Sequence, residues 1–329
     1  MEKCTLSIEK NLLLKIGHQN LLKDGDFPIS LRPMQIKTVI ESADKDVIAI
    51  LPTGYGKSAI IQLLPYFKNA MTGRTTSKVV VISSLNAILN DQSLRFGNTA
   101  CRMRLMSKLD CDSAETENDN DDMKVTVNSQ YVDGNFVYLL GHPEEFLSVH
   151  AIKSLLTSSW NCHVTHVIVD EAHCVVQWGD SFRPMFRKIS VLRSVFPSAC
   201  ILALTATANA VMESKIKDSL QMNEPLVIRK SCNRPNIFYA VRRRLSNTGR
   251  DHNVEFSYDA VLKTFIEELQ VTKAMFPKTV IYMKLKWCAH AHELALKVFR
   301  DDSSMCDKVA QYHASLSNEV KCLYSSILY

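Results

Sequence analysis

Several features are missing from this 329-residue sequence, and each absence excludes a class of protein. No apolar run approaches the ~18 residues that a transmembrane helix requires, so we expect no membrane protein. The first residues, MEKCTLSIEKNLLLKIG, lack the long apolar region of a secretory signal. The ten cysteines are scattered and form no C-x-x-C pair, which indicates reduced thiols in a cytosolic or nuclear protein.

The formal net charge is only +5, but the charges are unevenly distributed. The segment 110–122, DCDSAETENDNDD, holds seven acidic residues and no Lys or Arg. Without these seven negative charges the chain would carry +12. The segment has too few apolar residues for a core strand, so we expect a surface insertion or a disordered loop. A mildly basic body fits a polyanionic partner, although it also fits many proteins without one.

Short β-branched runs alternate with amphipathic stretches over the first two thirds of the chain. We expect strands at 46–51, 78–83, 136–140, 166–170 and 201–205, and helices near 57–69, 84–95, 143–157, 184–196 and 208–220. This alternation predicts a doubly wound α/β domain with a parallel sheet, whose ligand crevice lies at the carboxyl ends of the strands. The pattern then restarts with helices near 257–271 and 287–300 and strands at 278–283 and 308–313, which predicts the beginning of a second α/β domain.

The segment 49–64, AILPTGYGKSAIIQLL, reads as a strand, a glycine-rich turn and a helix. Glycines permit the tight turn in which backbone N–H groups surround phosphates, Lys57 would reach the β- and γ-phosphates, and Ser58 would hold Mg²⁺. The general pattern has glycine where this chain has Leu51, but the variant P-T-G-x-G-K-S is matched in full. The residues expected to bind the nucleotide here are Thr53, Gly54, Gly56, Lys57 and Ser58.

The segment HVIVDEAH ends an expected strand with Asp170 and Glu171, about 110 residues after the phosphate loop. In nucleoside triphosphatases, one acidic residue at a strand end holds Mg²⁺ and a second orients and deprotonates the attacking water. We expect Asp170 in the first role and Glu171 in the second, with Lys57 as the third catalytic residue. Adjacent residues at a strand end point in different directions, which allows two separate tasks.

Taken together, these motifs resemble those of superfamily-two helicases of the D-E-A-H type, and most specifically the RecQ family of DNA helicases. The resemblance covers roughly residues 25–236 and implies a P-loop NTPase fold of the RecA-like type. It also implies that Arg32 and Gln35 of LRPMQ read the adenine, and that Thr205 and Thr207 of ALTATA, with His173, couple hydrolysis to strand movement. The segments CNRPNIFYAV (232–241) and QYHASLS (311–317) resemble family motifs of the second domain.

The segment 172–184, AHCVVQWGDSFRP, resembles the aromatic-rich loop that RecQ helicases carry after D-E-A-H. In that family the loop contacts single-stranded DNA and reports its presence to the ATP site. Aromatic side chains stack on unpaired bases without needing a particular sequence, and an adjacent Arg can pair with phosphate. We therefore expect Trp178, Phe182 and Arg183 to bind DNA. The alternative is that Trp178 and Phe182 are core residues of the next helix.

Three departures from the family pattern stand out. The stretch 81–92, VISSLNAILNDQ, lacks the usual Ser-Pro-Leu turn but keeps Asp91 and Gln92, for which a DNA-backbone contact remains an expectation. Glu145 replaces the Arg of a Pro-Glu-Arg motif. No Gln-x-x-Gly-Arg-x-Gly-Arg stretch, which would supply an arginine finger, follows residue 236. The resemblance thus predicts an N-terminal helical segment (1–24), an ATP-binding domain (25–236) and a truncated second RecA-like domain (237–329).

The resulting hypothesis is an ATP-dependent 3′–5′ DNA helicase that uses Mg²⁺ with ATP and binds single-stranded or partly unwound DNA. By resemblance it would act in DNA repair or recombination, in the nucleus of a eukaryote or in the cytoplasm otherwise. Two alternatives remain open. One is a catalytically incomplete, ATP-gated nucleic-acid-binding module, which the missing arginine-finger motif favours. The other is an RNA helicase, which would share the ATP site.

Overall fold

The computed structural model describes residues 2–24, 30–107, 123–126, 129–178, 183–241, 243, 254–300, 302–306, 308–313, 315–317 and 320. The chain divides into two units, Met1–Arg234 and Pro235–Tyr329. The acidic segment 110–122 and Phe182 lie outside the described residues. None of the described helices combines the length and the apolar character needed to cross a bilayer.

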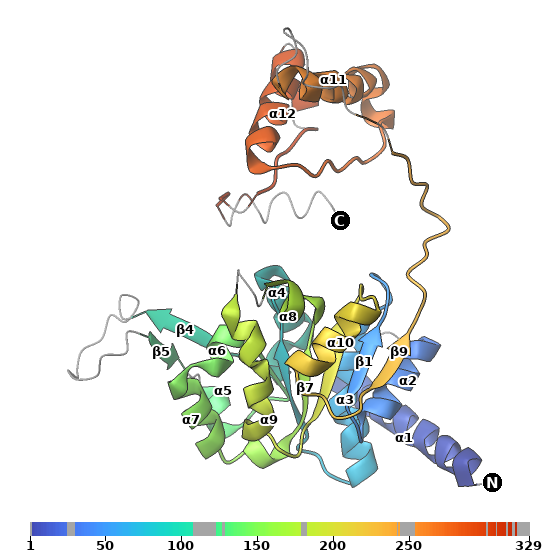
Figure 1. The fold of residues 1–329 in the computed structure, drawn as a ribbon, viewed down its shortest axis with the longest axis vertical. Helices are drawn as coiled ribbons and strands as arrows, with labels where there is room; N and C mark the ends of the chain where they lie inside the picture. Colours follow the sequence, from blue (N-terminus) through green and yellow to red (C-terminus); the bar gives the residue numbers. More distant parts are fainter. Residues whose placement is uncertain are drawn as a thin grey trace. The chain divides into compact units, whose positions relative to one another are not determined.

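Unit 1 is built around a seven-stranded parallel sheet (Figure 1). The spatial order of its strands is β3 (Ala100–Arg102), β6 (Tyr138–Gly141), β2 (Lys78–Ile82), β7 (Val164–Val169), β8 (Cys200–Thr205), β1 (Val47–Ile50) and β9 (Leu226–Arg229). The five strands expected from the sequence are confirmed, and β3 and β9 are added at the two edges. The doubly wound RecA-like fold is therefore confirmed for unit 1.

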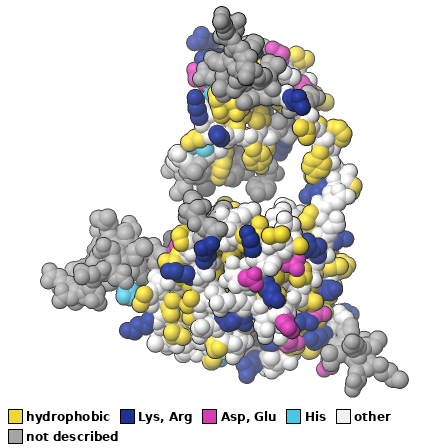
Figure 2. All heavy atoms as spheres, viewed as in Figure 1, with side chains coloured by type: hydrophobic (Ala, Val, Ile, Leu, Met, Phe, Trp, Pro, Cys, Tyr) yellow, Lys and Arg dark blue, Asp and Glu magenta, His cyan; other side chains and the backbone are white. Residues whose placement is uncertain are grey.

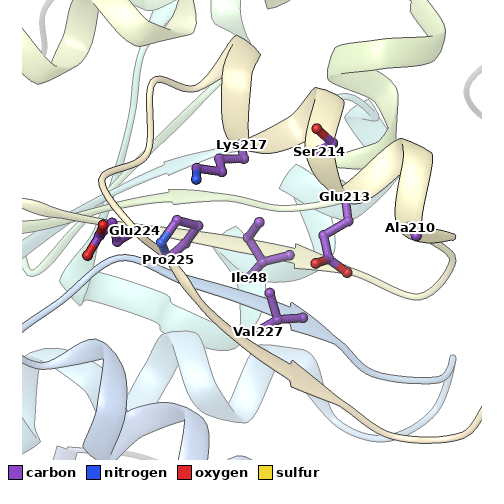
Figure 3. A pocket seen from close by; sticks show the side chains of 8 residues that line it. All are labelled: Ile48, Ala210, Glu213, Ser214, Lys217, Glu224, Pro225 and Val227. Carbon is purple, nitrogen blue, oxygen red and sulfur yellow. The ribbon is translucent and has the colours of Figure 1, made fainter.

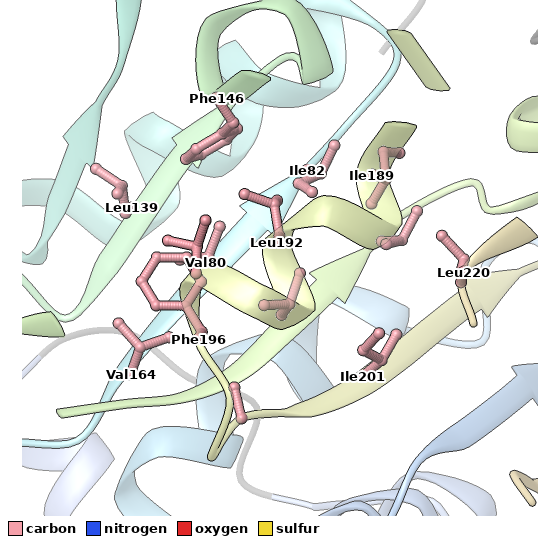
Figure 4. Packing of buried hydrophobic residues seen from close by; sticks show 14 of the residues in the cluster. Val80, Ile82, Leu139, Phe146, Val164, Ile189, Leu192, Phe196, Ile201 and Leu220 are labelled. Carbon is pink, nitrogen blue, oxygen red and sulfur yellow. The ribbon is translucent and has the colours of Figure 1, made fainter. Parts of the chain in front are cut away.

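The central strands are almost continuously apolar because both faces of the sheet are covered, as is usual for parallel sheets. In β1, Ile48 and Ile50 belong to the core on one face, whereas Val47 and Ala49 belong to the core on the other. Figure 4 shows the first of these cores, in which Val80 and Ile82 of β2 pack with Phe196 and other side chains from the covering helices. The strands thus hold a fixed register, and the loops at their carboxyl ends are held in place.

One face of the sheet is covered by α1 (Glu2–Asp24), α2 (Pro33–Ser42), α3 (Lys57–Thr72) and α4 (Asn86–Phe96). Helix α1 packs against α3, with Leu14 and Leu21 buried. A Cβ atom added at Gly17 would lie 3.0 Å from backbone atoms of Phe67, so a glycine permits the close approach of these two helices. The N-terminal helix therefore braces the helix that follows the phosphate loop.

The opposite face is covered by α6 (Pro143–Leu147), α7 (Val149–Thr157), α8 (His173–Trp178), η4 (Pro184–Val191), α9 (Leu192–Val195) and α10 (Ala210–Ser219). The expected helix 143–157 is split because Ser148 has an extended backbone and caps α7 by accepting a hydrogen bond from the Ala151 N–H. The expected helix 184–196 consists of the 3₁₀ segment η4 followed by α9. The remaining short helices are η1 (Gly97–Thr99), α5 (Ser129–Asp133) and η3 (Asn161–His163).

Two strands that the sequence analysis did not foresee flank the acidic segment. Strand β4 (Arg104–Ser107) pairs antiparallel with β5 (Met123–Thr126), with Arg104 opposite Thr126 and Ser107 opposite Met123.

Unit 2 contains α11 (Val254–Thr272), η5 (Lys273–Met275), α12 (Leu285–Val298) and α13 (Ser303–Cys306). The two expected helices are confirmed, and a small core forms around Leu262, Ile266 and Phe299. The strands expected at 278–283 and 308–313 are wrong, since neither segment is a strand. A strand is stable only in a ladder, and the described part of unit 2 offers no neighbouring strand.

The connector at the start of unit 2 exposes apolar side chains, which are yellow along the thin connection in Figure 2. Phe238 is 91% exposed and Val241 is 99% exposed. Tyr282, in the segment 278–283, is 93% exposed. The β-branched composition of segment 278–283 indicated a strand, but no strand among the described residues pairs with it.

Candidate active site

Three strand ends meet at the carboxyl edge of the unit 1 sheet. The phosphate loop 51–56 follows β1, Asp170 and Glu171 follow β7, and Thr205 ends β8. Strand β8 lies between β1 and β7, so Thr205 lies between the phosphate loop and the acidic pair. The sequence predicted that these motifs share one edge, and the sheet order brings them together.

The phosphate loop depends on glycine at two positions. Gly54 and Gly56 have φ angles of 76° and 85°, in the left-handed region that other residues adopt only with strain. A Cβ atom at Gly56 would also lie 2.5 Å from Gln35 Nε2. Leu51, by contrast, is fully buried, and its N–H donates to the Thr205 carbonyl at 2.9 Å. The side chain at position 51 therefore belongs to the core directly after β1.

Gln35 ties α2 to the phosphate loop. Its Nε2 donates to the carbonyl oxygens of Tyr55 and Gly56 at 3.0 and 2.8 Å, and its Oε1 accepts from the Arg32 N–H at 2.7 Å. The Arg32 guanidinium donates to the Gly54 carbonyl at 2.9 Å and lies 5.1 Å from the centre of the Tyr55 ring. Both residues predicted to read adenine thus contact the loop directly, while adenine recognition itself stays a prediction.

Glu171 lies at the centre of the acidic site. Its Oε1 is 3.7 Å from Lys57 Nζ, and its Oε2 is 3.3 Å from His173 Nδ1. His173 Nδ1 is also 3.1 Å from Thr205 Oγ1. The Thr207 N–H donates to the same hydroxyl at 3.3 Å. A continuous polar chain therefore runs from the phosphate-loop lysine to the end of β8.

The backbone and the charge of Glu171 are both unusual. Its φ angle is 50°, a left-handed conformation that non-glycine residues rarely adopt outside functional sites. Burial acts to raise the pKa of Glu171, but the His173 hydrogen bond and the Lys57 charge together hold that pKa below its ordinary value. Contacts with the Cys174 sulfur and the Glu171 carboxylate raise the pKa of His173 to about 9. At neutral pH the site therefore contains an ionised Glu171 beside a protonated His173.

Asp170 is more deeply buried than Glu171. It is 5% exposed; its Oδ1 accepts from the Glu171 N–H at 3.0 Å and its Oδ2 accepts from Gln92 Nε2 at 2.9 Å. Burial and the nearby Glu171 charge raise the pKa of Asp170 to about 6. The two acidic residues thus have different surroundings, as their adjacent positions at a strand end predicted.

The donor set fits a hard divalent cation. Asp170 offers a carboxylate whose burial would be offset by a cation, and Ser58 offers a hydroxyl in the first turn of α3. The Oε1 atom of Gln92 is a buried acceptor without a hydrogen-bond partner among the described residues. Oxygen ligands of this kind suit Mg²⁺, which Ser58 and Asp170 would hold.

Comparisons with known proteins agree with this geometry. Residues 32–214 match the model of the DEAD/DEAH box helicase family. The chain belongs to this helicase family. Its relatives include ATP-dependent helicase SGS1 of Saccharomyces cerevisiae, which is 30% identical over 66% of this chain and 14% of the yeast protein. The mouse protein named bifunctional 3′-5′ exonuclease/ATP-dependent helicase WRN is 26% identical over 94% of this chain and 21% of its own length.

A third relative, the RecQ-like DNA helicase BLM of Xenopus laevis, is 29% identical over 60% of this chain and 14% of its own length. These relatives confirm the resemblance to RecQ helicases. The chain spans only 14% of the length of SGS1 and 21% of the length of WRN. A solved structure of the DUF1998 helicase MrfA bound to DNA shares the fold, with a TM-score of 0.60 and 10% identity over 90% of this chain and 40% of MrfA.

The residues predicted to bind DNA lie partly outside the described structure. Trp178 ends α8, but its side chain is not described, and Phe182 is not described at all. Arg183 is described, and all three of its guanidinium nitrogens donate within the protein. Nε and Nη2 donate to the Glu144 carboxylate at 2.8 and 2.7 Å, and Nη1 donates to the Ser84 carbonyl at 2.7 Å.

The burial of Gln92 and Glu145 changes what the sequence suggested for these two residues. Gln92 is 1% exposed and contacts Asp170, so a direct DNA contact by this side chain is wrong. Glu145, which replaces an Arg of the family motif, is buried, and its Oε2 accepts from the His142 N–H at 2.6 Å. It caps α6 and does not present a negative charge to a nucleic acid.

The structure adds residues that the motif search did not assign to the site. Tyr55 lies under Arg32, Gln92 holds Asp170, and Glu144 holds Arg183. Glu144 carried a signal as part of the Pro-Glu pair, and Gln92 did so only as an expected DNA contact. Thr53 is exposed in the phosphate loop, where its position comes from the motif alone.

A separate cavity of about 380 Å³ lies between α10, β1 and β9 (Figure 3). Ile48 and Val227 form part of its apolar lining, and Glu213 and Lys217 of α10 contribute charge. It contains none of the residues of the phosphate loop or the acidic pair. The candidate active site is therefore the carboxyl edge of the sheet and not this cavity.

Proposed function

We propose that unit 1 binds ATP with Mg²⁺ at the carboxyl edge of its sheet and hydrolyses it as the motor of a DNA helicase. The observation that carries this proposal is the position of the Glu171 carboxylate between Lys57 and His173. Lys57, which follows the phosphate loop, and Glu171, which would activate water, form an ion pair. Phosphoryl transfer to water needs a cation on the phosphates and a residue that orients the water, and these two side chains are close enough to supply both.

Each residue has a separate task in this proposal. Lys57 binds the β- and γ-phosphates, and the N–H groups of the loop around Gly54 and Gly56 surround them. Glu171 orients the attacking water and accepts its proton, for which its ionised form is required. Asp170 and Ser58 hold Mg²⁺, which neutralises phosphate charge when bound. His173 relays a change at Glu171 to Thr205 at the end of β8.

We further infer that segment 178–183 contacts single-stranded DNA and that binding there stimulates hydrolysis. The relatives SGS1 and WRN are named ATP-dependent helicases, which supports a helicase motor. Movement in the 3′–5′ direction, a role in repair or recombination and a nuclear location follow from the RecQ resemblance and belong to the proposal. An RNA substrate and a binding-only module without turnover are the competing possibilities.

The test is phosphate release from ATP with and without single-stranded DNA, for the wild type, Lys57→Ala and the control Lys45→Ala. Lys45 is a surface lysine paired with Glu41 on α2, so its loss removes the same charge away from the site. We expect multiple turnovers that DNA stimulates in the wild type and in Lys45→Ala, and none in Lys57→Ala. Equal release by Lys57→Ala would refute the site.

Two further arms of the same assay separate the competing functions. Competition by single-stranded RNA as strong as by DNA would favour the RNA helicase. Nucleotide binding without turnover, at saturating DNA, would favour the binding-only module. Replacement of Trp178 by Ala should preserve nucleotide binding and reduce the stimulation by DNA, because a stacking surface is lost.

A further inference from the structure

Gln92 is a buried glutamine of α4 that contacts the acidic pair from outside the recognised motifs. Its side chain is 1% exposed, and its Nε2 donates to Asp170 Oδ2 at 2.9 Å. The other oxygen of this carboxylate, Oδ1, accepts from the Glu171 N–H at 3.0 Å. Because the two donors approach different oxygens, together they fix the rotation of the Asp170 carboxylate.

The contact with Asp170 also determines the orientation of the Gln92 amide. Only the NH₂ group can face a carboxylate, since the amide oxygen there would be repelled. The Oε1 atom must therefore point elsewhere. It is buried and has no hydrogen-bond partner among the described residues. A buried acceptor without a donor is unfavourable, so the arrangement indicates that a donor is supplied when the site is in use.

We propose that Gln92 is a positioning residue for the divalent cation of the ATP site. Its amide nitrogen holds Asp170 in the orientation that the cation needs, and its amide oxygen accepts a hydrogen bond from a water bound to that cation. Mg²⁺ retains several waters in protein sites, and residues that orient its ligands affect affinity strongly. The inference rests on the proposed function, because it assumes that this edge binds a Mg²⁺–nucleotide complex.

Gln92 lies on α4, which begins close to a residue that contacts Arg183. Helix α4 follows β2 through the loop that contains Ser84, whose carbonyl accepts from Arg183. The loop therefore contacts Arg183, and the helix that follows it contacts the proposed cation ligand Asp170. Gln92 is the residue through which α4 reaches the acidic pair.

The test measures the affinity of the 329-residue chain for a fluorescent ADP, once with Mg²⁺ and once with EDTA. The variants are Gln92→Met, which keeps the length but removes both polar atoms, and Gln92→Asn, which keeps the amide but is too short to reach Asp170. The control is Asp91→Asn on the exposed side of the same helix, where Asp91 pairs with Arg95. Thermal unfolding without nucleotide reports the stability of each variant.

We expect Mg²⁺ to increase ADP affinity in the wild type and in Asp91→Asn. In both Gln92 variants this increase should shrink by about tenfold, the effect usual for residues that orient metal ligands, while affinity in EDTA stays unchanged. An undiminished Mg²⁺ effect in either folded variant would overturn the inference and leave Gln92 a structural residue. A wild type that binds ADP without any Mg²⁺ effect, or not at all, would overturn the proposed function as well.

Discussion

Arg183 and Glu144 form a two-point ion pair, with Nε and Nη2 of the guanidinium 2.8 and 2.7 Å from the two carboxylate oxygens. The pair joins the start of η4 to α6, and the third donor, Nη1, reaches the loop after β2 through the Ser84 carbonyl. The arginine that the sequence predicted as a DNA contact therefore uses three of its five guanidinium N–H groups within the protein. Its geometry suits a role in fixing the start of η4, immediately after the segment predicted to bind DNA, against α6 and the loop after β2.

A double-mutant cycle on this pair tests that role. Arg183→Ala and Glu144→Ala should lower the affinity for single-stranded DNA to similar extents, and the double variant should be little worse than either. The expected coupling energy is roughly 0.5–3 kcal/mol, as for residues in direct contact. Fluorescence anisotropy with a labelled oligonucleotide measures it. A rise in affinity in Glu144→Ala would show instead that Arg183 binds DNA once it is released.

The phosphate loop provides a matched pair of glycine substitutions. Gly56→Ala should weaken ADP binding by more than about tenfold, because it adds left-handed strain of about 1–2 kcal/mol and forces Gln35 away from the loop. Gly73, which ends α3, also has a positive φ, of 65°, but an added Cβ there meets nothing within 4 Å. Gly73→Ala should therefore lower the free energy of unfolding by about the same strain while leaving ADP affinity intact. Equal loss of ADP affinity in both variants would argue against the special role of Gly56.

His166 of β7 predicts a pH dependence of stability. Burial lowers its pKa to about 4, and its Nε2 donates to the Ser42 carbonyl at 2.8 Å. The unfolded chain takes up this proton near pH 6.5, so stability is complete above that pH and falls as the pH drops towards 4. The shift corresponds to about 3 kcal/mol at 1.36 kcal/mol per pKa unit.

Urea unfolding between pH 7 and 4 measures this effect, with His166→Gln as the comparison. Gln cannot titrate but can still donate a hydrogen bond, so the variant should lose less stability than the wild type over this range. Other groups titrate in both proteins, and the difference between the two curves isolates His166. Parallel curves would contradict a buried, neutral histidine at this position.

The sequence predicted most of the site because its chemistry is local. The phosphate loop, Asp170 with Glu171, and Thr205 each follow a strand, and parallel strands bring such positions to one edge. The side-chain partners could not be foreseen in the same way. The contact between Gln92 and Asp170 joins residues 78 positions apart, and it depends on β2 lying next to β7.

In unit 2, by contrast, the sequence predicted strands that the structure does not contain among its described residues. The segment 278–283 has the β-branched composition of a strand, yet it is not one, because composition does not provide the neighbouring strand that a ladder requires. Edge strands β3 and β9 were missed as well, and their residues are less buried than those of the central strands. Sequence pattern thus identified the buried strands and was least informative at the edges of the sheet and in unit 2.

The most direct test of the account is single-turnover hydrolysis of ATP by Glu171→Gln. The substitution keeps the size of the side chain and removes only the carboxylate that would accept the proton of water. We predict that Glu171→Gln binds ATP with Mg²⁺ as the wild type does and releases phosphate about 10²–10⁴-fold more slowly, the range for loss of a general base. Release at the wild-type rate would contradict the claim that Glu171, held between Lys57 and His173, activates the attacking water.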